Sequence, residues 1–180
     1  MNVAKTKLLG VLIFEPSIFR DSRGYFKETF QKERYEKFGL SLNFVQDNFS
    51  RSQRGVLRGL HFQINKPQGK LVSCLRGAIY DVAVDINSSS KTFGQYVGVE
   101  LTEDNHKQLW IPPGYAHGFC VLSKTADFQY KCTDFYNPSD ERGIIWNDPF
   151  LKIDWPINKP YLSSKDSTLP KISEMKSETS

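Results

Sequence analysis

The three histidines of the chain, His61, His106 and His117, are the side chains best suited to acid–base or metal chemistry. His61 lies in the strand-like run VLRGLHFQ, close behind Arg58 and Gly59, and such a strand is a poor candidate for pure core. His117 follows a Pro-Gly turn in WIPPGYAHGF, whereas His106 lies in the polar stretch TEDNHK, where we expect a solvated turn residue. We therefore predict a site around His61 and His117. The alternative is that both are strand histidines with satisfied hydrogen bonds.

Residues 112–117, which read PxGxxH, together with a histidine on an earlier strand, resemble the two-motif pattern of the cupin superfamily, a small double-sheet jelly roll or barrel. The metal-binding cupins that this pattern resembles share a first motif with an HxH pair followed by a glutamate. Here the first motif reads HFQ from His61, and no glutamate lies between Gln63 and Val99. Two imidazoles and a glutamine are a poor ligand set for a divalent transition metal, so we expect no metal.

Length and charge restrict the class of protein. The chain has 180 residues, of which 39% are hydrophobic, so one domain can bury a sizeable core. The chain contains 24 Lys and Arg and 20 Asp and Glu, which gives a net charge of +4, but no block of five or more basic residues occurs. This pattern argues against nucleic acid as a partner and leaves open a local pocket for a phosphorylated ligand.

The cysteines and the apolar runs indicate the compartment. Cys74, Cys120 and Cys132 are odd in number, widely spaced and each inside an apolar run, which is typical of reduced core thiols in a cytoplasmic protein. No run approaches the roughly 18 apolar residues of a membrane span. The apolar run 8–14 ends at Glu15 and Pro16 without a small-residue cleavage site, so we interpret it as a strand and not a signal peptide.

Short apolar runs recur along the chain and predict the elements that must position these side chains. Their separators, among them DSRG, SRSQRG, NKPQG and NSSSKTFG, are rich in turn-forming residues. Many short strands without long helices predict an all-β sandwich, jelly roll or barrel, and we expect the cupin-type double-sheet form. The ten strand candidates are 10–14, 24–30, 43–48, 56–63, 70–75, 78–86, 95–101, 108–111, 115–122 and 126–133.

The rest of the chain predicts less regular structure. Residues 31–38 form the only helix candidate, with Gly39 as its stop. Prolines recur after Asn147 and exclude central strands, so we expect an irregular covering segment with short helical turns. We predict one domain over residues 1–170 and a disordered polar tail over residues 171–180.

Ten ordered runs between Phe14 and Asp166 resemble the dTDP-4-dehydrorhamnose 3,5-epimerase family. They are FRDSRGYFKETF, FVQDNFS, GVLRGLHFQ, GKLV, LRGAIYDVAVDI, TFGQYVGVEL, QLWIPPGYAHGF, YKCTDFYNPSDERGIIWNDP, IDWP and LSSKD. The resemblance implies a cofactor-free epimerisation of dTDP-4-dehydro-6-deoxyglucose to the L-rhamno ketone, a step toward dTDP-L-rhamnose. Such a reaction requires a stabilised enolate oxygen, a base on one face of the sugar ring and a proton donor on the other.

The resemblance also implies catalytic roles. His61 matches the family's base, Asp166 the carboxylate that orients it, Tyr130 the proton donor and Lys70 the lysine that holds the keto or enolate oxygen. Three of these residues also have a simpler interpretation without a catalytic role. Asp166 can be a capping or turn residue, Tyr130 one more aromatic of the core, and Lys70 an exposed lysine at a sheet edge.

Binding roles follow from the same resemblance. Arg23 and Arg58 match diphosphate contacts, which suit the guanidinium fork, and His117 matches a pocket histidine near the sugar. The family's homodimers complete each site with an amino-terminal strand of the neighbouring subunit, which implies that Arg23 and Glu28 act in trans. The positions that match nucleotide contacts are Glu28, Gln46, Asp47, Asn48, Glu141 and Lys165.

Three features qualify these expectations. Strict alternation puts Arg58 and His61 on opposite strand faces, so if both line one pocket the strand must be irregular, and Gly59 is where a bulge fits. Phe49 replaces a histidine of many relatives, and the run LVSCLRG with Cys74 is less basic than its counterpart. Rival functions are a relative that inverts only C3 or C5 or moves the ketone, and a noncatalytic nucleotide-sugar binder, which needs neither His61 nor Tyr130.

Overall fold

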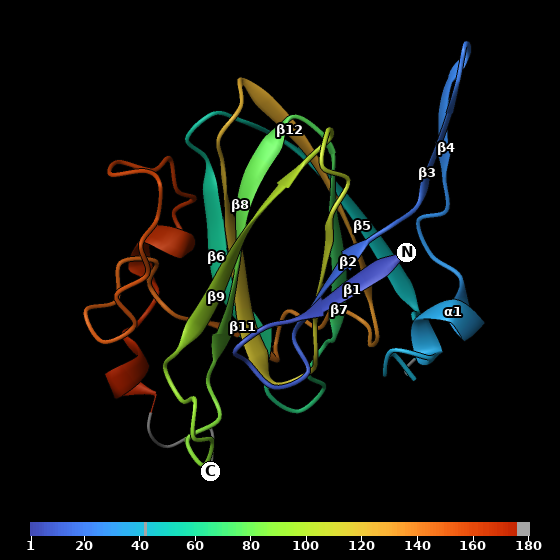
Figure 1. The fold of residues 1–180 in the computed structure, drawn as a ribbon. Helices are drawn as coiled ribbons and strands as arrows, with labels where there is room; N and C mark the ends of the chain where they lie inside the picture. Colours follow the sequence, from blue (N-terminus) through green and yellow to red (C-terminus); the bar gives the residue numbers. More distant parts are fainter. Residues whose placement is uncertain (42, 176–180) are drawn as a thin grey trace.

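The computed structural model describes residues 1–41 and 43–175 and consists mainly of two antiparallel sheets that face each other (Figure 1). The larger sheet contains, in spatial order, β1 (Asn2–Lys5), β2 (Leu12–Glu15), β10 (Gln108–Ile111), β7 (Lys70–Arg76), β12 (Thr125–Cys132) and β5 (Gln46–Gln53). The smaller sheet contains β13 (Glu141–Gly143), β6 (Leu57–Gln63), β11 (Tyr115–Val121), β8 (Ala78–Asp85) and β9 (Tyr96–Thr102). This is the predicted all-β, cupin-type double-sheet arrangement.

The smaller sheet is buried on both faces, and alternating side chains of its strands enter two different apolar clusters. In β8, Ile79 and Ala83 enter the cluster between the two sheets, whereas Val82 and Val84 enter a second cluster on the opposite face. A strand covered on both faces has an almost continuous apolar sequence, as β8 does. Each large apolar side chain buried in this way stabilises the fold by about 1.5–3 kcal/mol relative to its exposed state.

The covering segment supplies the second cluster. After β13 the chain runs over the outer face of the smaller sheet (Figure 1), where Ile144, Leu151 and Trp155 are buried against it. Two short 3-10 helices, η1 (Asp166–Thr168) and η2 (Ile172–Glu174), follow. The predicted tail is therefore wrong for residues 171–175, because Ile172 is buried and its N–H donates to the Asp148 carboxylate. The rest of the tail, residues 176–180, lies outside the described residues.

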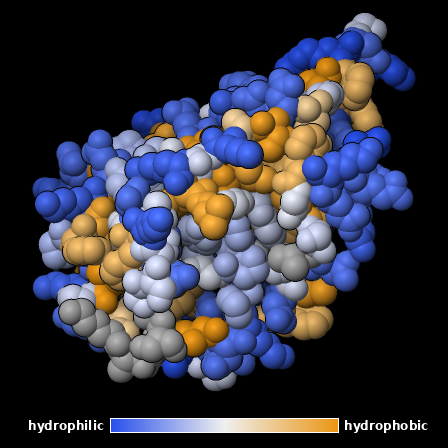
Figure 2. Space-filling model, turned by 60° about the horizontal axis from the view of Figure 1, so that its bottom comes forward, coloured by the Kyte–Doolittle hydropathy of each residue, from blue (hydrophilic) through white to orange (hydrophobic). Residues whose placement is uncertain are grey.

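An amino-terminal hairpin projects from the sheets (Figure 1). It consists of β3 (Ile18–Asp21) and β4 (Gly24–Lys27), and the helix α1 (Lys32–Glu36) follows it and buries Tyr35 against Phe14 of the larger sheet. The hairpin is exposed to solvent: Phe19 is 63% exposed and Phe26 is 68% exposed. Figure 2 shows hydrophobic residues, coloured orange, on the projecting arm. Exposed aromatic side chains of this kind mark an interaction surface.

Some sequence expectations were wrong for physical reasons. SRSQRG is not wholly a turn, because β5 continues to Gln53 as a polar edge strand that is held by β12 and by an ion pair of 2.6 Å between Arg51 and Asp127. His106 is buried and not solvated, because Tyr25 of the hairpin lies against its ring and Lys27 bonds to its Nδ1. The strands β1, β3 and β13 were not predicted; they are only three or four residues long.

The buried state of the cysteines agrees with the expectation of core thiols. Cys74, Cys120 and Cys132 are unpaired and buried. Among the described residues, no helix combines the length and the apolar character that crossing a membrane requires.

Candidate active site

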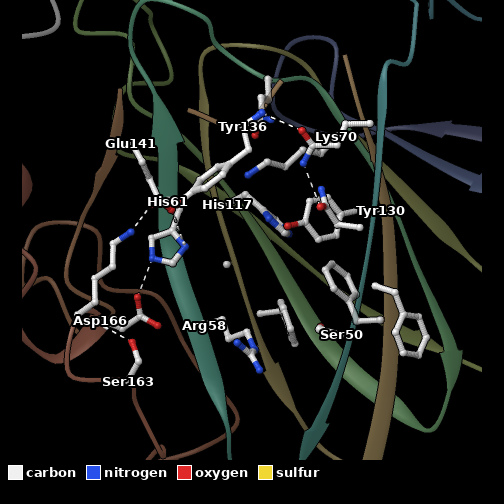
Figure 3. A pocket seen from close by; sticks show the side chains of 18 residues that line it. Ser50, Arg58, His61, Lys70, His117, Tyr130, Tyr136, Glu141, Ser163 and Asp166 are labelled. Carbon is white, nitrogen blue, oxygen red and sulfur yellow. Dashed lines mark hydrogen bonds and ion pairs between the residues drawn. The ribbon is translucent and has the colours of Figure 1, made fainter. Parts of the chain in front are cut away.

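A cavity of about 410 Å³ lies between the two sheets and is closed on one side by the covering segment (Figure 3). Strands β5, β7 and β12 of the larger sheet and β6 and β11 of the smaller one line it, with Phe119 and Phe128 among the apolar residues. Most of the site residues predicted from the sequence meet here. They are Gln46, Asn48, Arg58, His61, Lys70, His117, Tyr130, Glu141, Lys165 and Asp166.

An irregularity in β6 brings both Arg58 and His61 to this cavity. The register of β6 against β11 shifts between His117 and Phe119, and Gly59 has a left-handed φ of +104°. A Cβ at Gly59 would lie 2.6 Å from the carbonyl oxygen of His117, so a larger residue does not fit. The predicted irregularity at Gly59 is confirmed, and glycine is required there.

His61 and Asp166 form a hydrogen-bonded pair. Asp166, at the start of η1, is buried, and its Oδ1 lies 2.6 Å from His61 Nε2. Burial raises the pKa of the Asp166 carboxyl, but hydrogen bonds from His61, Ser163 and the Gly59 N–H outweigh this effect and leave the pKa below its usual range. An ionised Asp166 accepts a hydrogen bond from His61 Nε2–H. In that tautomer Nδ1 has the lone pair that can take a proton.

Tyr130 and Lys70 lie on the opposite sheet. They stand on the neighbouring strands β12 and β7, and the Lys70 ammonium lies 5.9 Å from the centre of the Tyr130 ring. Burial raises the pKa of Tyr130 to about 12, so its hydroxyl keeps its proton at neutral pH. Burial lowers the pKa of Lys70. Because β7 pairs with both β10 and β12, Lys70 is not the exposed edge lysine of the alternative interpretation.

A second histidine–carboxylate pair lies in the cavity wall. His117 Nε2 is 3.0 Å from Asp81 Oδ2, and both side chains are buried. Burial lowers the pKa of His117, although Asp81 opposes the shift. Asp81 was not predicted as a site residue. Its signal in the sequence is a charged residue in the middle of the apolar run AIYDVAVDI, a position that carboxylates seldom occupy without a partner.

Polar side chains surround the mouth of the cavity. Arg58 donates to Ser52 Oγ through Nε and Nη2, at 3.3 and 3.1 Å, and its guanidinium lines the cavity. Gln46 donates to Asn48 at 3.0 Å. The lining also contains Phe49 as an exposed aromatic, together with residues that were not predicted from the sequence, namely Ser50, Gln68, Tyr136 and Ser163.

Three predicted residues do not reach the cavity of their own chain. Arg23 lies on the exposed hairpin, where it pairs with Asp21 at 2.6 Å. Glu28 pairs with Arg34 at 2.7 Å. Asp47 lies between two cavity residues on β5, so alternation directs it to the other face, where it bonds to Lys131 at 2.9 Å. The expected contact of Asp47 with the nucleotide therefore has no support within this chain.

The described residues contain no group of three His, Cys, Asp or Glu side chains arranged to hold a metal ion. Each cavity imidazole instead has a carboxylate at its Nε2.

The fold and the cavity define a class of protein: a cupin-type jelly roll with a histidine–aspartate pair, a protonated tyrosine and a desolvated lysine around one small-molecule pocket. A family model described as dTDP-4-dehydrorhamnose 3,5-epimerase matches residues 5–174. The chain belongs to this family of sugar-nucleotide epimerases. The predicted family, fold class and enzyme class are confirmed.

Individual relatives are similar over nearly the whole chain. A dTDP-4-dehydrorhamnose 3,5-epimerase from Shigella flexneri is 55% identical over 168 residues, 92% of this chain and 93% of the relative. The enzyme of that name from Pseudomonas aeruginosa is 53% identical over the same shares. A crystal structure of dTDP-6-deoxy-D-glucose 3,5-epimerase from Legionella pneumophila, in complex with dTDP-4-keto-L-rhamnose, superposes with a TM-score of 0.94 at 54% identity and covers 96% of this chain and 93% of its own.

Proposed function

We propose that the protein converts dTDP-4-dehydro-6-deoxy-D-glucose to dTDP-4-dehydro-L-rhamnose by inversion at C3 and C5, without a cofactor, on the route to dTDP-L-rhamnose. The observation that carries this proposal is the placement of His61 and Tyr130 in one cavity, with Lys70 beside Tyr130. A noncatalytic binder on the same fold needs no such set.

The chemistry follows from the acidity of hydrogens next to a ketone. Nδ1 of His61 takes the proton from the carbon beside C4, and the electron pair moves onto the ketone oxygen to form an enolate. The Lys70 ammonium stabilises the developing negative charge, which a desolvated donor does better than water. Tyr130 then donates its proton to the same carbon from the other face, and solvent returns a proton to the phenolate and accepts one from the imidazolium.

Polar residues at the mouth of the cavity support the binding of the nucleotide. We assign the diphosphate to Arg58, further nucleotide contacts to Gln46, Asn48 and Lys165, and a sugar contact to His117. Within the described residues the guanidinium of Arg58 hydrogen-bonds to a serine hydroxyl and forms no ion pair, so it can turn to phosphate without breaking one.

Arg58→Ala is expected to weaken binding more than turnover. The diphosphate is remote from the carbon atoms that react, so its contacts act on substrate and transition state alike. We expect KM and the dissociation constant of free dTDP to rise at least about tenfold, with kcat close to that of the wild type, in steady-state kinetics and titration calorimetry. Unchanged affinity for free dTDP would remove Arg58 from the diphosphate site.

We propose a homodimer in which the hairpin of one subunit completes the cavity of the other. The hairpin projects from its own chain (Figure 1). It carries exposed Phe19, Phe26 and Arg23, which supports a role in trans. In this arrangement Arg23 and Glu28 contribute to the neighbouring site. The unpaired, buried cysteines support our proposal that the protein works in the cytoplasm.

A mixture of two impaired variants, assayed at a substrate concentration below KM, tests this arrangement. Combining an Arg23→Ala chain with a His61→Asn chain should regenerate activity, because one site of each heterodimer then contains neither substitution. The measurement is turnover after subunit exchange, with exchange itself followed by native mass spectrometry of the mixture. Heterodimers that form without recovered activity would show that each chain builds its site alone.

The number of inverted centres tests the function itself. After incubation with dTDP-4-dehydro-6-deoxy-D-glucose and reduction of the ketone, analysis of the released sugar should give the L-configured products of two inversions. Inversion at a single centre would favour the rival, a 3- or 5-epimerase with the same acid and base. A moved ketone would favour a ketoisomerase.

A further inference from the structure

His106, which lies outside the cavity, attaches the amino-terminal hairpin to the turn between β9 and β10. The imidazole is buried, the ring of Tyr25 lies against it with the ring centres 4.8 Å apart, and the Lys27 ammonium is 3.2 Å from its Nδ1. Both partners belong to β4, and the His106 N–H donates to the Thr102 carbonyl oxygen at the end of β9. The hairpin projects from the sheets (Figure 1), and these contacts help to fix the angle at which it leaves them.

The surroundings of His106 suit a neutral imidazole only. An ammonium group has no acceptor, so Lys27 donates to Nδ1 and the proton of the neutral ring stays on Nε2. Nε2 is buried and has no hydrogen-bond partner within the described residues. The cavity histidines His61 and His117 differ, because each has a carboxylate at its Nε2. His106 has instead a cation at the nitrogen that a second proton would occupy.

Protonation of His106 is therefore unfavourable while the hairpin is docked on the turn. The titratable and charged groups around the ring are Tyr25 and Lys27 of β4, Arg20 of β3 and Asp104 of the turn itself. Burial lowers the pKa of His106, and the charges of Lys27 and Arg20 lower it further, whereas Asp104 opposes the shift. A histidine released into solvent has an ordinary pKa of about 6.5. The docked state binds the proton less readily, so docking is favoured above that pH and weakens as the pH falls below it.

We infer that His106 is a positioning residue for the hairpin and that its protonation releases the hairpin from the turn. The released hairpin exchanges its amide hydrogens faster. In the proposed homodimer it also carries Arg23 and Glu28 less effectively into the neighbouring cavity. This second effect rests on the proposed function and its dimer, whereas the first depends on the contacts of His106 within its own chain.

His106→Asn removes the titration and keeps an acceptor for Lys27. Asparagine also tolerates the left-handed backbone of this position, where φ is +54°. The measurement is hydrogen exchange of residues 18–27, expressed as protection factors that correct for the intrinsic effect of pH. Between about pH 7.5 and 5.5, wild-type protection should fall at least about threefold, while that of His106→Asn stays constant. Lys107→Met is the matched control, since it removes a cation of the same turn that pairs with Glu15 at 3.3 Å, and it should behave as the wild type.

Kinetics at a single pH test the effect on the neighbouring cavity. At about pH 5.5 the KM of the wild type should exceed that of His106→Asn at least about twofold with equal kcat, whereas at about pH 7.5 the two KM values should agree. Two proteins compared at the same pH share the titration of the substrate, of His61 and of His117. A fall in wild-type protection without any difference in KM would overturn the effect on the neighbouring cavity.

Lys27→Met keeps the test decisive if His106→Asn folds poorly, because it removes the cation from the hairpin and leaves the turn unchanged. Its protection should depend on pH less than that of the wild type. Wild-type protection that does not change between the two pH values would overturn the inference, as would an equal fall in His106→Asn. A wild-type protein that does not turn over the substrate would overturn the proposed function alone, since hydrogen exchange needs no turnover.

Discussion

His61→Asn is expected to lower kcat by at least about 100-fold, the loss typical of a removed general base. Asparagine keeps a polar side chain near Asp166 but has no nitrogen that can take a proton from carbon. The affinity for free dTDP should stay close to that of the wild type, because the residues assigned to the nucleotide lie elsewhere in the cavity. Steady-state kinetics and calorimetric titration with dTDP give the two values.

Asp166→Asn provides the comparison for this variant. It keeps the imidazole but loses the carboxylate that orients it at 2.6 Å, so its kcat should lie between those of wild type and His61→Asn. Equal and complete inactivation of both, with a lowered melting temperature, would indicate collapse of the covering segment. A His61→Asn variant with normal turnover would remove His61 from the role of base.

Tyr130→Phe is expected to separate proton exchange from inversion. The substitution removes one hydroxyl and leaves His61, Lys70 and the cavity shape in place, so the enolate should still form. Protonated His61 can return a solvent-derived proton to the face from which it took one, and deuterium should therefore enter the substrate. Inversion should fall at least about 100-fold, because the donor on the opposite face is lost. Nuclear magnetic resonance of the sugar in deuterium oxide measures both processes.

Tyr161→Phe is a suitable control, because Tyr161 is 73% exposed and lies outside the cavity lining. If Tyr130→Phe inverted both centres at the control's rate, Tyr130 would be only an aromatic of the core. If exchange and inversion were both lost while dTDP still bound, Tyr130 would have to act before the enolate forms, by polarising the ketone together with Lys70.

Local patterns in the sequence predicted most of the strands. They did not predict which residues far apart in the sequence come into contact. The apolar runs of β8 and β11 predicted buried strands because burial on both faces produces continuous apolar sequence. Whether Lys70 stood at an edge depended on strand order, which pairs β7 with β10 and β12 across long stretches of chain. Asp166 lies 105 residues from His61, and only the family resemblance indicated that the two could meet.

A local signal in the sequence separates Asp47 from its neighbours. Alternation along β5 places Gln46 and Asn48 on the cavity face and Asp47 on the other, so the strand period sets one of the three expected nucleotide contacts apart from the other two. The buried state of His106 had no such signal, because it results from the packing of Tyr25 and Lys27 of the hairpin onto a turn with polar sequence.

The most direct test of a two-face, cofactor-free epimerisation is the position of deuterium in the product that the wild-type protein forms in deuterium oxide. The account predicts one solvent-derived deuterium at C3 and one at C5, each on a carbon of inverted configuration, as resolved by nuclear magnetic resonance of the dTDP-sugar. Inversion with retention of the original hydrogen at either carbon, or exchange at only one of them, would contradict it.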